Sequence, residues 1–203
     1  MSQSYLLRNV RPFGAATCDL LIENGRIAQL ASNIPVEPLY RLFDGQNQLL
    51  LPGLVNAHAH IDKNLFGRPW HANQTPEPRR IRDYVDNERR LRRELELSAH
   101  TQSTHEVRRA LAAGVTHIRT HVDIDTEAGL SHFEGILATK EAFKSSLTMQ
   151  TVAFPQSGML IRPGTVELLG EAVKMGADCI GGRGPSTPGR APGPPFDTVF
   201  AAC

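Results

Sequence analysis

Two histidines separated by a single residue are the first side chains in the sequence whose type and spacing could do chemistry. His58 and His60 lie in residues 51–63, where a short apolar run after Pro52 and Gly53 leads to them. In an extended strand, side chains at positions i and i+2 point to the same face, so both imidazoles converge, with Asp62 next in that register. Two neutral imidazoles so placed can share one first-row metal ion. The same spacing also fits two half-buried, hydrogen-bonded histidines, so the motif alone leaves both interpretations open.

Composition indicates an ordinary globular chain of 203 residues, 40% hydrophobic and 21% charged. The net charge of +1 gives no electrostatic argument for a nucleic acid or a membrane as partner. Cys18, Cys179 and Cys203 are widely spaced without a Cys-x-x-Cys motif, which favours a reducing compartment. The sequence shows neither the features of a signal peptide nor a run of about 18 apolar residues. We therefore expect a cytoplasmic protein.

Residues 1–50 are predicted to form a small β-sandwich module, incomplete by itself. Asn24 and Gly25 separate two strand-like runs, at 18–23 and 26–30, and tolerate the positive φ values of a type I′ hairpin. Residues 43–45 indicate a second turn before a short strand at 48–51.

The following residues alternate between strand and helix patterns. The spacing of Ser103 and Glu106 is that of a capping box, which predicts a helix start there, and Gly114 ends that helix. Such alternation implies parallel βαβ units, in a barrel or a doubly wound sheet. The further predicted helices are 81–97, 132–144 and 165–175, and the predicted strands are 115–123, 147–154 and 177–180.

The first predicted helix is rich in arginine. A nucleic-acid groove binder is one interpretation of this charge, and a solvated helix face is the other. Asp86 lies four residues before Arg90, and Glu88 four before Arg92, which is the spacing of intrahelical ion pairs. With the whole chain near neutral, we favour the solvated face. The arginines are Arg79, Arg80, Arg82, Arg89, Arg90, Arg92 and Arg93.

Three motifs together carry a family resemblance. They are Leu-Pro-Gly-Leu-Val-Asn-Ala-His-Ala-His-Ile-Asp-Lys at 51–63, His-Ile-Arg-Thr-His-Val-Asp at 117–123 and Val-Ala-Phe-Pro-Gln-Ser-Gly at 152–158. The chain, from about residue 5 to 182, resembles the metal-dependent amidohydrolase superfamily, and within it the cytosine-deaminase-like branch. The first motif is shared by many amidohydrolases, and the other two are more specific to cytosine-deaminase relatives.

This resemblance implies an α/β fold, the N-terminal part of a (β/α)8 TIM barrel preceded by a small β-sandwich module. It also implies that His58 and His60 ligate one divalent metal ion, Fe(II) or Zn(II), and that Gln156 binds the substrate. The implied reaction is hydrolytic deamination of a pyrimidine base such as cytosine, in which metal-activated water attacks the ring carbon bearing the amine. Such an enzyme is a hydrolase of C–N bonds in cyclic amidines. Hydrolysis of another cyclic amidine or amide is the alternative.

Other polar residues of the motifs receive supporting roles. Arg119, His121 and Asp123 alternate on one strand face, and we expect them to point into the barrel, with a buried Arg119–Asp123 pair supporting the site. Lys63 is expected to contact substrate or support the metal ligands. Trp70 and His71 are candidates for lining the mouth of the pocket.

The sequence also departs from the family. The family uses a third metal histidine, a glutamate, a further histidine and an aspartate from later strands, but no histidine follows His132. No general acid or base is identifiable. We therefore expect a truncated front half of such an enzyme, divided into 1–50, 51–182 and a Gly/Pro-rich irregular tail at 183–203, and inactive alone as a non-catalytic remnant. A small molecule is the expected partner, and a homo-oligomer stays open.

Overall fold

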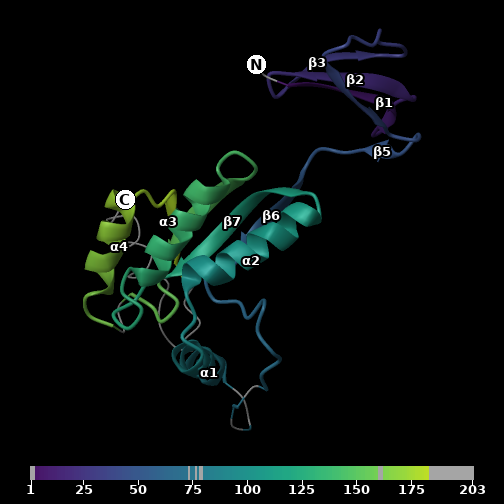
Figure 1. Ribbon diagram of the computed structural model, residues 1–203. Helices are drawn as coiled ribbons and strands as arrows, with labels where there is room; N and C mark the ends of the chain where they lie inside the picture. Colours follow the sequence, from purple (N-terminus) through teal and green to yellow (C-terminus); the bar gives the residue numbers. More distant parts are fainter. Residues whose placement is uncertain (1–2, 73, 76, 78–79, 160–161, 183–203) are drawn as a thin grey trace. The chain divides into compact units, whose positions relative to one another are not determined.

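The computed structural model describes residues 3–72, 74–75, 77, 80–159 and 162–182 (Figure 1). The predicted tail at 183–203 and Arg79 lie outside these residues. The chain divides into two compact units, Met1–Pro52 and Gly53–Cys203. None of the helices in the described ranges is both long and apolar enough to span a membrane.

The first unit is a five-stranded sheet. Its order is β3-β2-β1-β4, and β5 also pairs with β1. The predicted hairpin is confirmed, since φ is 52° at Asn24 and 72° at Gly25, between the antiparallel strands β2 and β3. Leu6, Leu21 and Ile34 form its small core. The strands are β1 (Ser4–Pro12), β2 (Cys18–Glu23), β3 (Arg26–Ala31), β4 (Tyr40–Asp44) and β5 (Leu49–Leu50).

The second unit contains a four-stranded sheet in which strand order follows chain order. β6 (Leu54–Ala59), β7 (Val115–Asp123), β8 (Thr148–Phe154) and β9 (Cys179–Ile180) lie side by side, and each neighbouring pair is parallel. Gly53 permits the start of β6, because a Cβ there would lie 2.0 Å from Oγ1 of Thr116. Sequential parallel strands are the arrangement of a barrel wall, whereas a doubly wound sheet reverses its order at a switch point.

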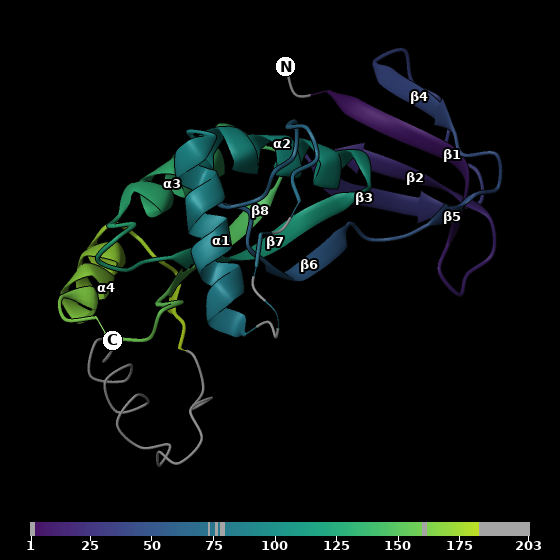
Figure 2. The ribbon, with the colours of Figure 1, turned by 90° about the horizontal axis from the view of Figure 1, so that it is seen from below.

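The helices that follow the strands pack on one face of this sheet. α2 (Ala99–Ala112), α3 (Ser131–Phe143) and α4 (Thr165–Lys174) contact β7, β8 and β9, and α2 lies against α3 (Figures 1 and 2). A single core cluster joins them to the strands, and it includes Val107, Phe133, Leu169, Val122 and Ala153. One-sided helices favour the barrel over the doubly wound alternative. α1 (Ile81–Glu94) precedes them and contributes no described residue to this cluster.

One predicted helix start is wrong. α2 begins at Ala99, and Ser98 caps it by accepting a hydrogen bond from the Thr101 amide at 3.4 Å. Ser103 instead lies inside the helix, where its hydroxyl donates to the Ala99 carbonyl and contacts Thr139 of α3. The capping-box spacing was therefore coincidental, because a serine one turn earlier takes the cap. The first predicted helix also ends early, at Glu94 rather than residue 97.

Candidate metal centre

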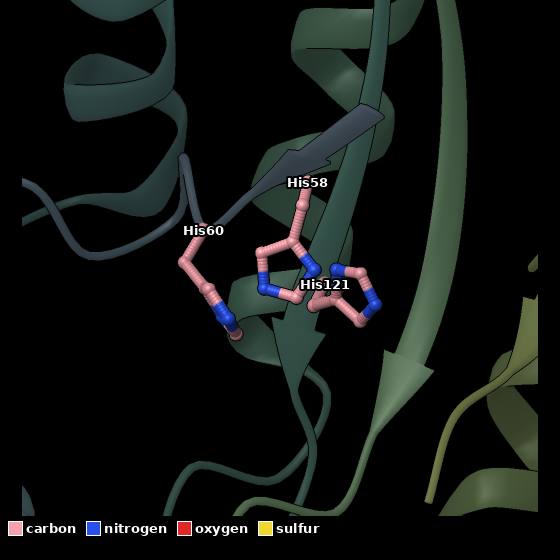
Figure 3. A group of neighbouring side chains, drawn as sticks. All are labelled: His58, His60 and His121. Atoms are coloured by element: carbon pink, nitrogen blue, oxygen red, sulfur yellow. The ribbon is translucent and has the colours of Figure 1, made fainter. Parts of the chain in front are cut away.

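Three imidazoles from β6, the residue that follows it and β7 meet on the face of the sheet opposite to α2, α3 and α4. His58 lies on β6, His60 follows the end of β6, and His121 lies on β7 (Figure 3). One ligand atom from each imidazole lies within 4.8 Å of the others. The ring centroids of His58 and His121 are 4.3 Å apart, and each of these rings lies 5.3 Å from that of His60. Parallel pairing of β6 with β7 produces this cluster.

Two of the three imidazoles, His60 and His121, have the protonation and the hydrogen-bond state that a metal ion requires. Burial lowers the pKa of His60 to about 4, helped by the nearby Lys63 ammonium, and burial also lowers the pKa of His121. Both rings are therefore neutral near pH 7 and can donate a lone pair. Nδ1 of His60 and Nδ1 of His121 are buried and have no hydrogen-bond partner within the described part of the chain. The three imidazoles thus fit a divalent first-row ion.

Asp62 does not continue the register of the two histidines. β6 ends at Ala59, and the chain turns at Ile61 and Asp62. The fully buried Asp62 carboxylate accepts hydrogen bonds from the Asp123 amide and from Nδ1 of His132, both at 3.2 Å. Burial alone would raise its pKa, but the His132 hydrogen bond and nearby cations lower it instead. Asp62 therefore ties the end of β6 to β7 and α3.

Lys63 lies at the centre of a buried polar cluster at the carboxyl ends of the strands. Its Nζ donates to both carboxylate oxygens of Asp123 at 2.9 Å and to Oε1 of Gln156 at 2.5 Å. The predicted Arg119–Asp123 pair is wrong. Lys63 takes the place of the arginine, and Arg119 donates to Gln150 at an exposed position. Burial raises the pKa of Asp123 to about 6, and the neighbouring Asp62 contributes to this increase.

A cavity of about 390 Å³ lies beside the polar cluster, and His60 is the member of the histidine cluster that lines it. Lys63 and Gln156 line it beside His60. Trp70 does not, since it is 86% exposed, and neither Trp70 nor His71 belongs to the cavity lining that the structure describes. Sequence reasoning missed the contribution of α1, because helical spacing alone does not show which face meets the strand ends. The remaining lining residues are Tyr84, Val85, Glu88 and Phe154.

The arginines of α1 are not simply a solvated face. Arg92 and Arg89 expose only 8% and 15% of their side chains. Arg89 pairs with Asp125 and Glu127 of the loop after β7, and Arg92 approaches Asp62 at 4.0 Å. These carboxylates come from the strand ends rather than from α1 itself. The prediction of a solvated face is therefore wrong for these two residues, which hold the helix against the site.

Comparison with known proteins agrees with this architecture, although no family model matches the chain. The crystal structure of N-isopropylammelide isopropylaminohydrolase from Burkholderia multivorans is 40% identical, with a TM-score of 0.90, over 98% of this chain. The chain belongs to the amidohydrolase superfamily. The predicted fold class, the N-terminal part of a TIM barrel preceded by a small β module, is confirmed by the likeness to these barrel enzymes.

More distant relatives lie in the same superfamily. The 5-methylcytosine deaminase of Klebsiella pneumoniae is 27% identical, with a TM-score of 0.63, over 87% of the chain. N-isopropylammelide isopropyl amidohydrolase of Pseudomonas sp. strain ADP is 30% identical over 71% of the chain, and the uncharacterized protein YahJ of Escherichia coli K12 is 27% identical over 88%. The chain spans 36% and 39% of these two curated relatives, and 50% and 43% of the two crystallised enzymes.

Proposed function

We propose that residues 53–182 form the metal-binding and substrate-binding part of a hydrolase that releases an amine from a ring carbon of a nitrogen heterocycle. The observation that carries this proposal is the cavity that places His60 of the histidine cluster beside Lys63 and Gln156. A small apolar and polar cavity beside a candidate metal centre is a typical active-site arrangement.

In this proposal His58, His60 and His121 hold one Fe(II) or Zn(II) ion, which when bound supplies Lewis-acid activation of water. The chain's own residues bind and orient the substrate. The Gln156 amide can both donate to and accept from a carbonyl and ring-nitrogen edge. The Lys63 ammonium, which already donates to Asp123 and Gln156, supplies positive charge beside the carbonyl oxygen of the substrate. The Phe154 ring packs edge-on against His60 and His121, with centroids 5.7 and 5.6 Å away, and excludes water from that side.

The substrate class follows from the relatives. We propose a six-membered ring with an exocyclic amine, for which N-isopropylammelide and cytosine are the first two compounds to test. The name of the Burkholderia enzyme supplies the first compound, and its 40% identity favours it. Cytosine is the parent base of the 5-methylcytosine in the name of the Klebsiella enzyme. The general acid/base is proposed to come from the part of the longer relatives that this chain does not match.

A chimera tests the proposal. Residues 53–182 replace the corresponding segment of the Burkholderia enzyme, and amine release from N-isopropylammelide and from cytosine is measured with Zn(II) or Fe(II). We expect the chimera to release amine from one of the two, and His58→Ala or His60→Ala to abolish this. Arg90→Met is the control, since Arg90 pairs with Glu94 and Asn87 on its own helix. A folded, metal-loaded chimera that releases no amine from either compound contradicts the proposal.

A further inference from the structure

The wall that α1 contributes to the cavity is held in place by polar contacts rather than by the apolar core. Among the side chains described on α1, Leu91 is the buried apolar residue, and the core cluster of this unit contains none of them. Tyr84 on the same helix is 43% exposed although it lines the cavity. The position of α1 therefore depends on its ion pairs and hydrogen bonds.

Arg89 makes contacts that join three separate segments. One guanidinium nitrogen, Nη2, donates to the Asp125 carboxylate after β7 and to the Ser157 hydroxyl after β8, the latter at 2.6 Å. The other, Nη1, lies 3.3 Å from the Glu127 carboxylate. A planar guanidinium can serve several acceptors at once in a fixed geometry, which an ammonium cannot reproduce.

The acceptors of Arg89 are themselves fixed. Oδ2 of Asp125 also accepts from the Ser157 hydroxyl at 3.0 Å, and its Oδ1 accepts from the amides of Glu127 and Ala128 at 2.9 and 3.0 Å. The Asp125 side chain is only 2% exposed. Arg89 therefore binds to a loop whose conformation is already fixed by the hydrogen bonds of Asp125.

The residues that directly precede Arg89 and Ser157 in sequence both line the cavity. Glu88 precedes Arg89 on α1, and Gln156 precedes Ser157 after β8, and both line the cavity beside Lys63. Glu88 lies 3.7 Å from the Lys63 Nζ, and Gln156 accepts a hydrogen bond from the same atom. We propose that Arg89 is a positioning residue, which fixes Glu88 and Gln156 around Lys63 by clamping α1 to the loops after β7 and β8. This inference rests on the proposed function in so far as the cavity receives the substrate.

The test compares Arg89→Met, Arg89→Lys and the control Arg90→Met in the Zn(II)-loaded chain. Hydrogen exchange is followed in peptides covering residues 81–94, 155–159 and the strand 115–123, and the affinities for cytosine, N-isopropylammelide and Zn(II) are measured on the same samples. In Arg89→Met we expect exchange about 10-fold faster in the first two segments and unchanged in β7. We expect about 10-fold weaker binding of whichever compound binds the parent, at constant Zn(II) affinity. Arg89→Lys should fall between this variant and the parent, and Arg90→Met should match the parent.

Two results would overturn the clamp. One is Arg89→Met exchange equal to that of the parent in both segments. The other is an equal acceleration in all three segments, which marks a general loss of stability. If neither compound binds the parent chain, the proposed function fails, but the exchange comparison still decides whether Arg89 clamps α1 and the loop after β8.

Discussion

The histidine cluster and the polar cluster around Lys63 lie beside one another yet differ in how their polar atoms are satisfied. Lys63 donates to Asp123 and Gln156, so its charge is compensated within the protein. The buried Nδ1 atoms of His60 and His121 have no such partner in the described part of the chain. Buried polar atoms are normally paired, and exceptions often mark function. The comparison indicates that Lys63, Asp123 and Gln156 compensate one another, whereas the two imidazoles keep a buried nitrogen available to a metal ion.

The largest expected effect comes from removing one imidazole of the histidine cluster. His58→Ala should weaken Zn(II) binding by on the order of 100-fold or more, because two imidazoles bind a divalent ion far more weakly than three. His117→Ala is the matched control, since this histidine lies on β7 at an exposed position outside the cluster. Titration against a chelator of known affinity measures both. Equal affinities in the two variants would contradict the assignment.

The polar cluster is disrupted most directly by a substitution at Lys63. Lys63→Met leaves the Asp123 carboxylate, 9% exposed, without its cation, which should cost roughly 3 kcal/mol of unfolding free energy. Lys140→Met serves as the control, because its pair with Asp178 is about one-third exposed and should contribute no more than about 1 kcal/mol. Urea unfolding measures both values. A loss at Lys63 no greater than at Lys140 would show that the polar cluster is not a rigid wall.

The pH dependence of stability tests the burial of His60 in the histidine cluster. The pKa of His60 is about 4 in the folded chain and about 6.5 when unfolded, so the unfolded state binds more protons between these values. The His60 contribution to the stability of the metal-free chain should therefore rise from pH 4 to 6.5 and level off above. Asp123, whose pKa is raised to about 6, contributes in the opposite direction, so the His60 contribution is read as a difference between variants. Since the ring is only partly buried, solvent screening limits the contribution to about 1–2 kcal/mol. In urea unfolding with chelator, the unfolding free energy of the parent minus that of His60→Gln should increase from pH 4 to 6.5, and a difference that does not change with pH would refute the burial argument.

The smallest effect is expected far from both clusters in sequence. Gly25 has a φ of 72°, and a Cβ added there would meet no atom within 4 Å, so Gly25→Ala suffers from backbone strain alone. We expect a loss of about 1 kcal/mol, read from the unfolding of the β module, with Zn(II) affinity unchanged. A change in Zn(II) affinity would mean that the first unit influences the metal centre.

Periodicity predicted much of the fold but not its tertiary pairings. The alternation in residues 115–123 correctly placed His121 on the face opposite to the core. Its distance from His58, however, depends on how β6 aligns with β7, and the sequence of either strand does not specify that register. Arg92 likewise has the spacing of a partner for Glu88, whereas its approach to Asp62 depends on where α1 crosses the strand ends. Local patterns identified the elements, and long-range packing chose the partners.

X-ray absorption at the zinc edge of the Zn(II)-loaded chain tests the central claim most directly. If His58, His60 and His121 hold the ion, the spectrum will show three imidazole nitrogens at about 2.0–2.1 Å, and His121→Ala will lose one of them. A shell made only of oxygen ligands, or a spectrum that His121→Ala leaves unchanged, would contradict the account.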